Sequence, residues 1–269
     1  MKDTGLKVYP AHIAGAIVFI SAAGIYFLAP LAAAVLLVAY VILCIVACFF
    51  PGTNFLGPVI SRGLTRERKV ALTFDDGPSE QTTLKILDLL DRHKIKATFF
   101  VSGVNARRHP EIISEIVRRG HEIGNHSMGH DPLLMLKSAK TIDREVHRAA
   151  QVLREAGIET LAFRPPVGIV NPKLFPILQC RGLICVSFSL RARDFGNRRV
   201  KNLAGRILPK VTGDDIILLH DTPVSRHEDE ALLWEEFEKI LVGLKKGGLK
   251  VVPLSELTGR QIMRHGRQQ

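Results

Sequence analysis

The chain has 269 residues, of which 46% are hydrophobic and 23% charged, with a formal net charge of +11 at pH 7. This composition suits one substantial globular domain with an appendage, and it excludes a low-complexity chain or a repeat protein of the solenoid or propeller type. No nucleic-acid recognition motif accompanies the positive charge, so we expect no nucleic-acid partner.

The N-terminal part contains a long apolar segment. Between Ala11 and Phe50 there is no Lys, Arg, Asp or Glu. This length is about twice what one membrane crossing needs. With Pro30 near the middle, the segment predicts a transmembrane hairpin of two helices, 11–28 and 31–50. The alternatives are a single span with a re-entrant piece, or a secretory signal peptide, whose apolar core is normally much shorter.

The remaining chain is polar enough to be soluble and carries nearly all of the charge. Residues 1–58 hold only two of the 37 basic and one of the 26 acidic residues. We therefore predict an N-terminal membrane anchor, 1–58, that ends in a linker, 51–58, and a catalytic domain, 59–269. A basic domain beside a lipid bilayer favours anionic lipid head groups or phosphate-bearing substrates as partners, and an ordinary solvated surface is the alternative.

Basic residues flank both ends of the apolar segment. They are Lys2 and Lys7 before it, and Arg62, Arg66, Arg68 and Lys69 after it. A hairpin with such flanks places both ends on the cytoplasmic side of a bacterial inner membrane, whereas a single crossing leaves the side of the domain open. The four cysteines lack the spacing of a disulfide framework or a zinc ribbon, so we expect buried thiols in a reducing compartment.

Short apolar runs alternate with amphipathic stretches after the linker. The runs predict strands at 69–74, 96–101, 121–126, 160–163, 184–189, 215–220 and 249–254. The stretches predict helices at 80–93, 110–119, 137–156, 171–181, 198–209, 227–246 and 255–264, the first with Ser79 as N-cap. This alternation indicates parallel βα units in a closed or nearly closed barrel. A doubly wound sheet is the alternative, but no glycine-rich dinucleotide loop follows the first strand.

Titratable or cationic side chains follow five of the predicted strands. They are Asp75 and Asp76, His126 and His130, Arg164, Arg193 and Asp194, and His220 and Asp221. In such barrels the chemistry collects where strands end, so we expect these side chains to share one site. Two adjacent carboxylates repel each other, which indicates that they face a cation.

His126 and His130 stand four residues apart, the spacing of one helical turn, and can bind one ion together. A surface or capping pair is the alternative. A carboxylate from Asp75 or Asp76 would complete a ligand set typical of catalytic divalent metals, and the other aspartate would be free as a base.

Further strand-end residues can complete the chemistry. Arg164 can orient a carboxylate, His220 can donate a proton to a leaving nitrogen, and Asp194 can hold that imidazole in one tautomer. Together with the metal and the base, they predict metal-assisted hydrolysis of an amide or ester.

Five motifs, "TFDDG", "HSMGH", "RPPVG", "RDF" and "LLHD", follow in this order within roughly residues 66–255. With them the chain resembles the polysaccharide deacetylases, the NodB-homology family or carbohydrate esterase family 4. The resemblance implies a distorted (β/α)7 barrel that removes an N-acetyl or related N-acyl group from an amino sugar. It also implies one divalent metal ion, Zn²⁺ first, with Co²⁺ or Ni²⁺ as alternatives.

The resemblance further implies a role for each matching residue. Asp75 is the general base and is oriented by Arg164. His220 is the general acid and is tuned by Asp194. The metal ligands are Asp76, His126 and His130.

Three positions are expected to bind substrate, and two of them depart from the family pattern. Leu218 lines the pocket for the acyl methyl group. Val167 replaces an aromatic residue but keeps the backbone N–H that helps hold the oxyanion. Phe195 replaces a tryptophan and keeps a flat apolar wall. Because a long polymer normally stacks on aromatic rings, these changes favour a small or lipid-linked sugar.

We therefore expect a membrane-anchored N-deacetylase that acts on a lipid-linked glycan precursor, such as a polyprenyl-phosphate-linked acylated amino sugar. Deacetylation of peptidoglycan or another exported polysaccharide is the alternative within the hydrolases. A metal-binding but inactive membrane scaffold is the alternative of a different class.

Overall fold

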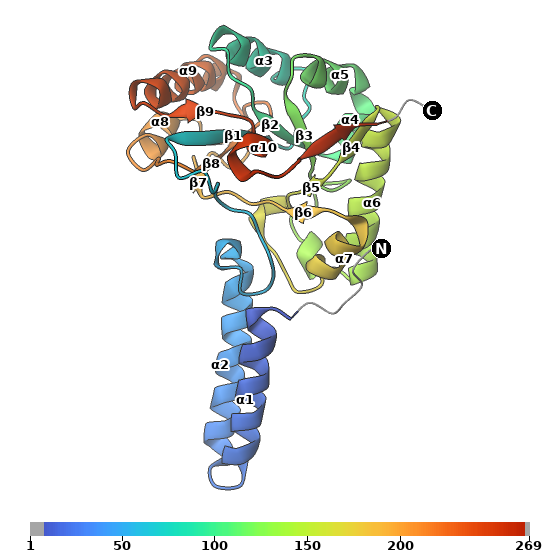
Figure 1. Ribbon diagram of the computed structural model, residues 1–269. Coiled ribbons are helices and arrows are strands. Elements are labelled where there is room, and N and C mark those ends of the chain that lie inside the picture. The colour runs from blue at the N-terminus through green and yellow to red at the C-terminus, as the bar shows by residue number, and fades with distance from the viewer. Residues whose placement is uncertain (1–7, 267–269) are drawn as a thin grey trace.

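The computed structural model describes residues 8–266, which form a helical hairpin attached to an α/β domain (Figure 1). The predicted basic flank at Lys2 and Lys7 lies outside the described residues, as do the last three residues of the chain.

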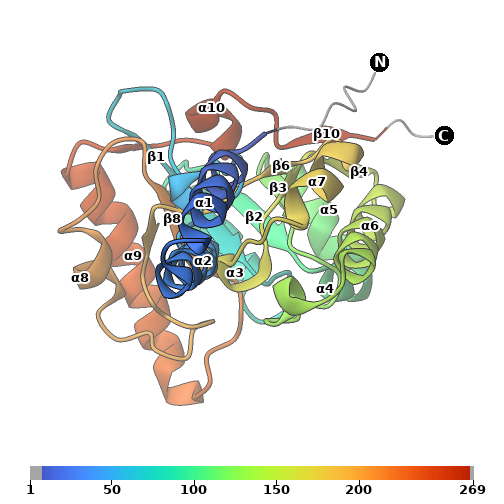
Figure 2. The same ribbon diagram turned by 90° about the horizontal axis from the view of Figure 1, so that it is seen from below.

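The hairpin consists of α1 (Pro10–Tyr26) and α2 (Pro30–Cys48), which lie side by side in both views (Figures 1 and 2). The hydroxyl of Tyr40 donates to the carbonyl of Ala11 across the pair, at 2.7 Å. Within residues 8–266, α2 is the one helix long and apolar enough to span a bilayer, with a mean hydropathy of 3.0, while α1 has 17 residues. Both helices lie where they were predicted, and their membrane crossing stays a prediction.

A parallel sheet forms the centre of the α/β domain. Its strands are β1 (Lys69–Asp75), β2 (Thr98–Val101), β3 (Glu122–Asn125), β5 (Ala162–Phe163), β6 (Ile184–Cys185), β7 (Leu190–Arg191), β8 (Ile216–His220) and β9 (Lys250–Val251). They are arranged in the order β6-β5-β3-β2-β1-β8-β7, with β9 beside the start of β1. A separate antiparallel pair is formed by β4 (Ile158–Thr160) and β10 (Met263–His265).

The sheet curls into a half-barrel, which agrees with the predicted distorted (β/α)7 barrel. Its path ends at β6 and β7, and the chain that leaves the hairpin lies near this opening. There Ile60 bridges to Val186 after β6, and Arg62 bridges to Asp215 before β8. The segment that follows the hairpin is therefore part of the barrel wall.

Helices cover the outside of the sheet. They are α3 (Thr83–Arg92), α4 (Gly103–Arg108), α5 (Pro110–Arg118), α6 (Ala139–Glu155), α7 (Leu174–Arg181), α8 (Leu203–Ile207), α9 (Glu230–Lys246) and α10 (Leu254–Thr258). The core between sheet and helices is apolar and closely packed. Phe74 of β1 stacks on Phe99 of β2 at 5.2 Å and meets Phe237 of α9 edge-on.

Some predicted boundaries are wrong. The last predicted helix, 255–264, ends at Thr258, because Gly259 takes a positive φ of 63° and the following residues form β10. The predicted N-cap Ser79 does not start its helix, since α3 begins at Thr83. Short elements without a clear periodic pattern, α4, β4, β7 and β10, were not predicted.

Candidate active site

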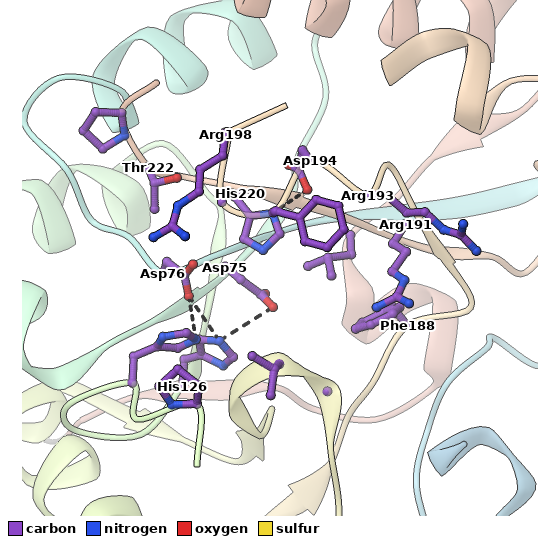
Figure 3. A pocket seen from close by; sticks show the side chains of 18 of the residues that line it. Asp75, Asp76, His126, Phe188, Arg191, Arg193, Asp194, Arg198, His220 and Thr222 are labelled. Atoms are coloured by element: carbon purple, nitrogen blue, oxygen red, sulfur yellow. Dashed lines mark hydrogen bonds and ion pairs between the residues drawn. The ribbon is translucent and has the colours of Figure 1, made fainter. Parts of the chain in front are cut away.

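A pocket of about 780 Å³ opens where the strands of the half-barrel end (Figure 3). Asp75 ends β1 and Asp76 follows it, His126 follows β3, and His220 ends β8. The pocket therefore brings together side chains from strands that are far apart in the sequence, as the strand-end argument predicted.

The two adjacent aspartates face different partners because the backbone turns between them. Asp76 takes a left-handed φ of 77°, which a short polar side chain tolerates better than most. The carboxylate of Asp75 thereby meets Arg164, while that of Asp76 meets His126 and His130 (Figure 3). Asp75 Oδ2 also lies 3.8 Å from His126 Nε2.

Asp75 is fixed by a buried arginine. Arg164 Nη1 donates to Asp75 Oδ1 at 2.6 Å and to the hydroxyl of Thr73 at 2.8 Å. Its Nη2 donates to the carbonyl of Ser187, and its guanidinium lies 4.0 Å from the ring centroid of Phe100. Because these contacts fix the position of the guanidinium, its hydrogen bond to Asp75 also fixes the orientation of the carboxylate.

Asp76, His126 and His130 form a cluster that fits a divalent cation. Each offers one ligand atom, and these atoms lie within 4.8 Å of one another. His126 Nδ1 donates to the carbonyl of Arg164 at 2.8 Å, which leaves the lone pair of Nε2 toward the cluster. Asp76 Oδ1 is buried and lies 3.0 Å from His130 Nε2 and 3.4 Å from His126 Nε2. A carboxylate oxygen and two imidazole nitrogens are the ligands that Zn²⁺ and related ions prefer.

Electrostatics favour the ionised form of Asp76. Burial raises the pKa of its carboxyl, but hydrogen bonding and charge attraction from His126 and His130 lower that pKa far more, so the net direction is strongly downward. The ligand oxygen is therefore deprotonated at neutral pH and available to a cation.

The histidine pair does not lie on a helical turn, so this part of the prediction is wrong. Residues 126–130 form a loop in which Ser127 and His130 take positive φ values of 67° and 50°. The side chain of Asn125 accepts from the Ser127 N–H, and the Ser127 hydroxyl accepts from the His130 N–H. These bonds hold the loop, and the two imidazole centroids lie 4.8 Å apart.

His220 and Asp194 form a second pair on the other side of the pocket. His220 Nδ1 lies 2.8 Å from Asp194 Oδ1, and Asp194 is buried. Burial lowers the pKa of His220, but the hydrogen bond and charge of Asp194, together with the charges of Asp75 and Asp76, raise it to about 9. The imidazole is therefore protonated at neutral pH and can donate from Nε2.

The predicted substrate-binding residues also line the pocket. Leu218 is buried in β8, while Val167 and Phe195 stand on loops and are 47% and 59% exposed. Val167 has a φ of 53°, which is strained for a β-branched residue, and such strain concentrates at functional sites. Their contact with substrate stays a prediction.

Asp221 is a buried residue to which the sequence argument gave no role. Its carboxylate accepts from the hydroxyls of Thr82 and Thr83, each at 2.6 Å, and a Cβ on Gly77 would lie 2.2 Å from its Oδ2. Its N–H donates to the carbonyl of Asp75. Asp221 therefore holds the loop between β1 and α3, and its place beside His220 in "LLHD" was the available signal.

Comparison with known proteins agrees with this geometry. The family model described as polysaccharide deacetylase matches residues 62–184. A peptidoglycan-N-acetylglucosamine deacetylase of Bacillus cereus is 35% identical over 193 residues, which cover 71% of this chain and 88% of the relative. The chain belongs to the polysaccharide deacetylase family.

Other members of the family extend the comparison. A chitooligosaccharide deacetylase of Sinorhizobium fredii is 35% identical over 164 residues, covering 60% of this chain and 76% of that protein. The crystal structure of the Bc1960 peptidoglycan N-acetylglucosamine deacetylase superposes with a TM-score of 0.69 at 30% identity, covering 77% and 95% of the two chains. This polysaccharide deacetylase is thus a hydrolase that acts on the N-acetyl amide bond, in a family that is metal-dependent.

Proposed function

We propose that this protein removes the acetyl group from an N-acetylglucosamine-type residue of a glycan. The proposal rests on one observation: the metal-binding cluster of Asp76, His126 and His130 lies in the same pocket as Asp75 and His220. An ion site, a base and a protonated acid together satisfy what amide hydrolysis requires.

The side chains divide the reaction between them. A divalent cation, when bound by the Asp76 cluster, supplies Lewis acidity to the site. Asp75, held by Arg164, accepts a proton from the attacking water. The N–H of Val167 donates to the negative charge that develops on the carbonyl oxygen. His220 donates a proton to the departing nitrogen, so that the C–N bond breaks to give acetate and a free amine.

Acetate release from a chitooligosaccharide by the purified full-length protein with Zn²⁺ or Co²⁺ tests this function. We expect wild-type turnover, and loss of both metal and turnover in His130→Gln. His109→Gln, a histidine outside the pocket, is the matched control and should retain both. A wild-type protein that binds the metal but releases no acetate from any acetylated amino sugar would favour the inactive scaffold instead.

We also propose that the hairpin anchors the protein in a bacterial inner membrane, with residues 1–58 as the anchor. Large apolar side chains point outward all around both helices. Those with exposed fractions of at least 60% include Ile17, Phe19, Ile20, Phe27, Leu28, Leu31 and Val35. An apolar surface of this kind has no stable place in water, whereas lipid covers it without cost.

The relatives favour a polymeric substrate, since they are named for peptidoglycan and chitooligosaccharide. One feature favours the second candidate, a lipid-linked glycan precursor. The carbonyl of Cys48, the last residue of α2, accepts from the N–H of Val170 at 3.1 Å. Val170 follows the loop of Val167, which lines the pocket, so anchoring by the hairpin would bring the pocket close to the bilayer.

The side of the membrane on which the domain lies separates these two substrates. A positive flank predicts a cytoplasmic domain, where a lipid-linked precursor is available and mature peptidoglycan is not. Reporter fusions at the C-terminus of the full-length protein measure this directly. A reporter active only outside the cytoplasm would leave the exported polymer as the substrate.

A further inference from the structure

The segment 191–206 contains six basic residues and one acidic residue. Its basic residues are Arg191, Arg193, Arg198, Arg199, Lys201 and Arg206. In the part of the chain that the structure describes, none of these six forms a salt bridge. Some basic side chains elsewhere are neutralised, as when Arg119 contacts three carboxylates. The only acid within the segment, Asp194, is occupied by His220.

Three of these arginines, Arg191, Arg193 and Arg198, line the active-site pocket. Figure 3 shows Arg198 beside Asp76 and Thr222, with Arg191 and Arg193 on the opposite side of His220. Arg191 is the register partner of Leu218, and its guanidinium lies 5.9 Å from the ring centroid of Phe188. None of the three side chains donates a hydrogen bond to the residues that the structure describes.

The acids of the pocket do not compensate these arginines. Asp75 pairs with Arg164, Asp194 pairs with His220, and Asp76 belongs to the cation site. Three further cations therefore remain around one cavity, and their mutual repulsion gives the fold no stability. Such an arrangement raises the local concentration of an anionic ligand and offers it donors that are free.

We propose that Arg191 and Arg193, on one side of the pocket, bind a phosphate group carried by the acetylated amino sugar, and that Arg198 adds positive charge from the other side. This proposal rests on the deacetylase function and narrows its substrate to a phosphorylated sugar. Planar guanidinium groups bind phosphate oxygens through two parallel hydrogen bonds, which a neutral chitooligosaccharide cannot offer.

The position of Arg191 connects this phosphate site with the hairpin. Phe188, over which Arg191 lies, packs against the loop of Val167, since a Cβ on Gly168 would lie 3.1 Å from its ring. The same loop is bonded to the end of α2 through Val170. A phosphate that links a sugar to a membrane lipid would therefore enter on this side, and a soluble sugar phosphate offers the same chemistry.

Acetate release by full-length protein in lipid nanodiscs, loaded with Zn²⁺, tests the proposal. The substrates are N-acetylglucosamine, N-acetylglucosamine 1-phosphate, polyprenyl-phosphate-linked N-acetylglucosamine and, as a carboxylate-bearing sugar, N-acetylmuramic acid. We expect kcat/KM to be at least about tenfold higher for the phosphorylated sugars than for the neutral one, as charge-assisted hydrogen bonds imply. Equal kcat/KM values for the soluble and the lipid-linked sugar phosphate would show that the phosphate alone is recognised. A higher kcat/KM for the lipid-linked substrate would show that the lipid or the bilayer also contributes to recognition.

Substitutions assign the effect to the arginines. In Arg191→Gln and in Arg193→Gln/Arg198→Gln, the ratio of phosphorylated to neutral kcat/KM should fall at least about tenfold, mainly through KM. Arg191→Lys should have a ratio between those of Arg191→Gln and the wild type, because lysine keeps the positive charge but lacks the planar guanidinium that donates two parallel hydrogen bonds. Arg199→Gln removes a charge from the same segment outside the pocket and should keep the wild-type ratio.

The outcomes separate this proposal from the deacetylase function. If neutral and phosphorylated sugars are cleaved equally well and the arginine substitutions do not change the ratio of their kcat/KM values, the phosphate site is wrong and the deacetylase function is retained. If N-acetylmuramic acid is preferred to the sugar phosphates, the arginines bind a carboxylate and the phosphate assignment is overturned. If no substrate releases acetate, the deacetylase function itself fails.

Discussion

At the scale of single residues, Asp75 and Asp76 show how one peptide bond separates two kinds of chemistry. A left-handed φ at Asp76 turns its carboxylate to His126 and His130, while Asp75 stays in strand geometry against Arg164. One carboxylate therefore lies against two imidazoles that can bind a cation with it, and the other lies against the guanidinium of Arg164. Neither residue could exchange roles with its neighbour without rebuilding the end of β1.

Replacement of the base should separate catalysis from metal binding. We expect Asp75→Asn to reduce kcat for acetate release by about 10²–10⁴-fold, because the attacking water then lacks a proton acceptor. The metal content, measured by elemental analysis, should stay at the wild-type level, since the ligands lie on other side chains. Asp88→Asn, at an acid on the protein surface, is the control. A fully active Asp75→Asn protein would remove Asp75 from the mechanism.

Asp194 should control the alkaline limit of activity. Its carboxylate stabilises protonated His220, whose pKa is about 9, so turnover should fall as the pH rises above that value. In Asp194→Asn this stabilisation is lost and the pKa moves down toward the ordinary value of 6.5. We expect the descending limb of the kcat profile to shift by about one to two pH units to lower pH. An unchanged limb would show that another group is the acid.

At the scale of elements, the hairpin and the pocket meet at a small apolar junction. Phe175 of α7 contacts Tyr9 before α1 and lies directly against Gly57 after α2. Ala47 near the end of α2 and Val170 belong to the same buried cluster. The hairpin is thus packed onto the domain and not joined to it by a loose tether.

Crowding this junction should disturb the domain. A Cβ on Gly57 would lie 2.4 Å from the ring of Phe175, so Gly57→Ala forces a backbone or ring displacement. We expect it to lower the free energy of unfolding by about 1–3 kcal/mol, measured by thermal or denaturant unfolding in detergent. Gly24→Ala in α1 is the matched control, because its Cβ meets nothing within 4 Å. Equal stability of the two variants would argue against a packed junction.

The elements that the sequence predicts well are those with a strong periodic pattern. The predicted strands 69–74 and 215–220 correspond to β1 and β8, and both are buried and flanked by helices. The predicted helical pairing of His126 and His130 failed because hydrogen bonds from Asn125 and Ser127 hold a loop there. Side chain to backbone bonds of this kind leave no periodic signal in a sequence.

At the scale of the whole molecule, the half-barrel brings residues that are far apart in the sequence together in one site. Arg164 after β5 reaches Asp75 at the end of β1, and Asp194 after β7 reaches His220 at the end of β8. The residue types were predictable from their positions at strand ends. The sequence did not single out the arginines of the pocket as a group. Only a structure can show that these arginines line one cavity and form no salt bridge with the described residues.

Removal of the metal should affect the whole molecule reversibly. A chelator should abolish acetate release, and addition of Zn²⁺ or Co²⁺ should restore it. Metal at about 100 times its Kd should also raise the free energy of unfolding by about 2.7 kcal/mol, measured as a shift in Tm between the chelated and reloaded protein. Persistent activity after complete removal of metal would contradict the assignment of Asp76, His126 and His130.

The chain between the hairpin and β1 has a practical consequence for shortened versions of this protein. Leu56 and Val59 are buried in the domain, and Ile60 and Arg62 are bridged to its sheet. Truncation at residue 66, shortly before the first signature motif, would remove this segment and expose the apolar surface that it covers. A soluble fragment that begins near residue 54 keeps residues 56–62 in place. We expect this fragment to be monomeric in analytical ultracentrifugation, and the fragment that begins at residue 66 to self-associate.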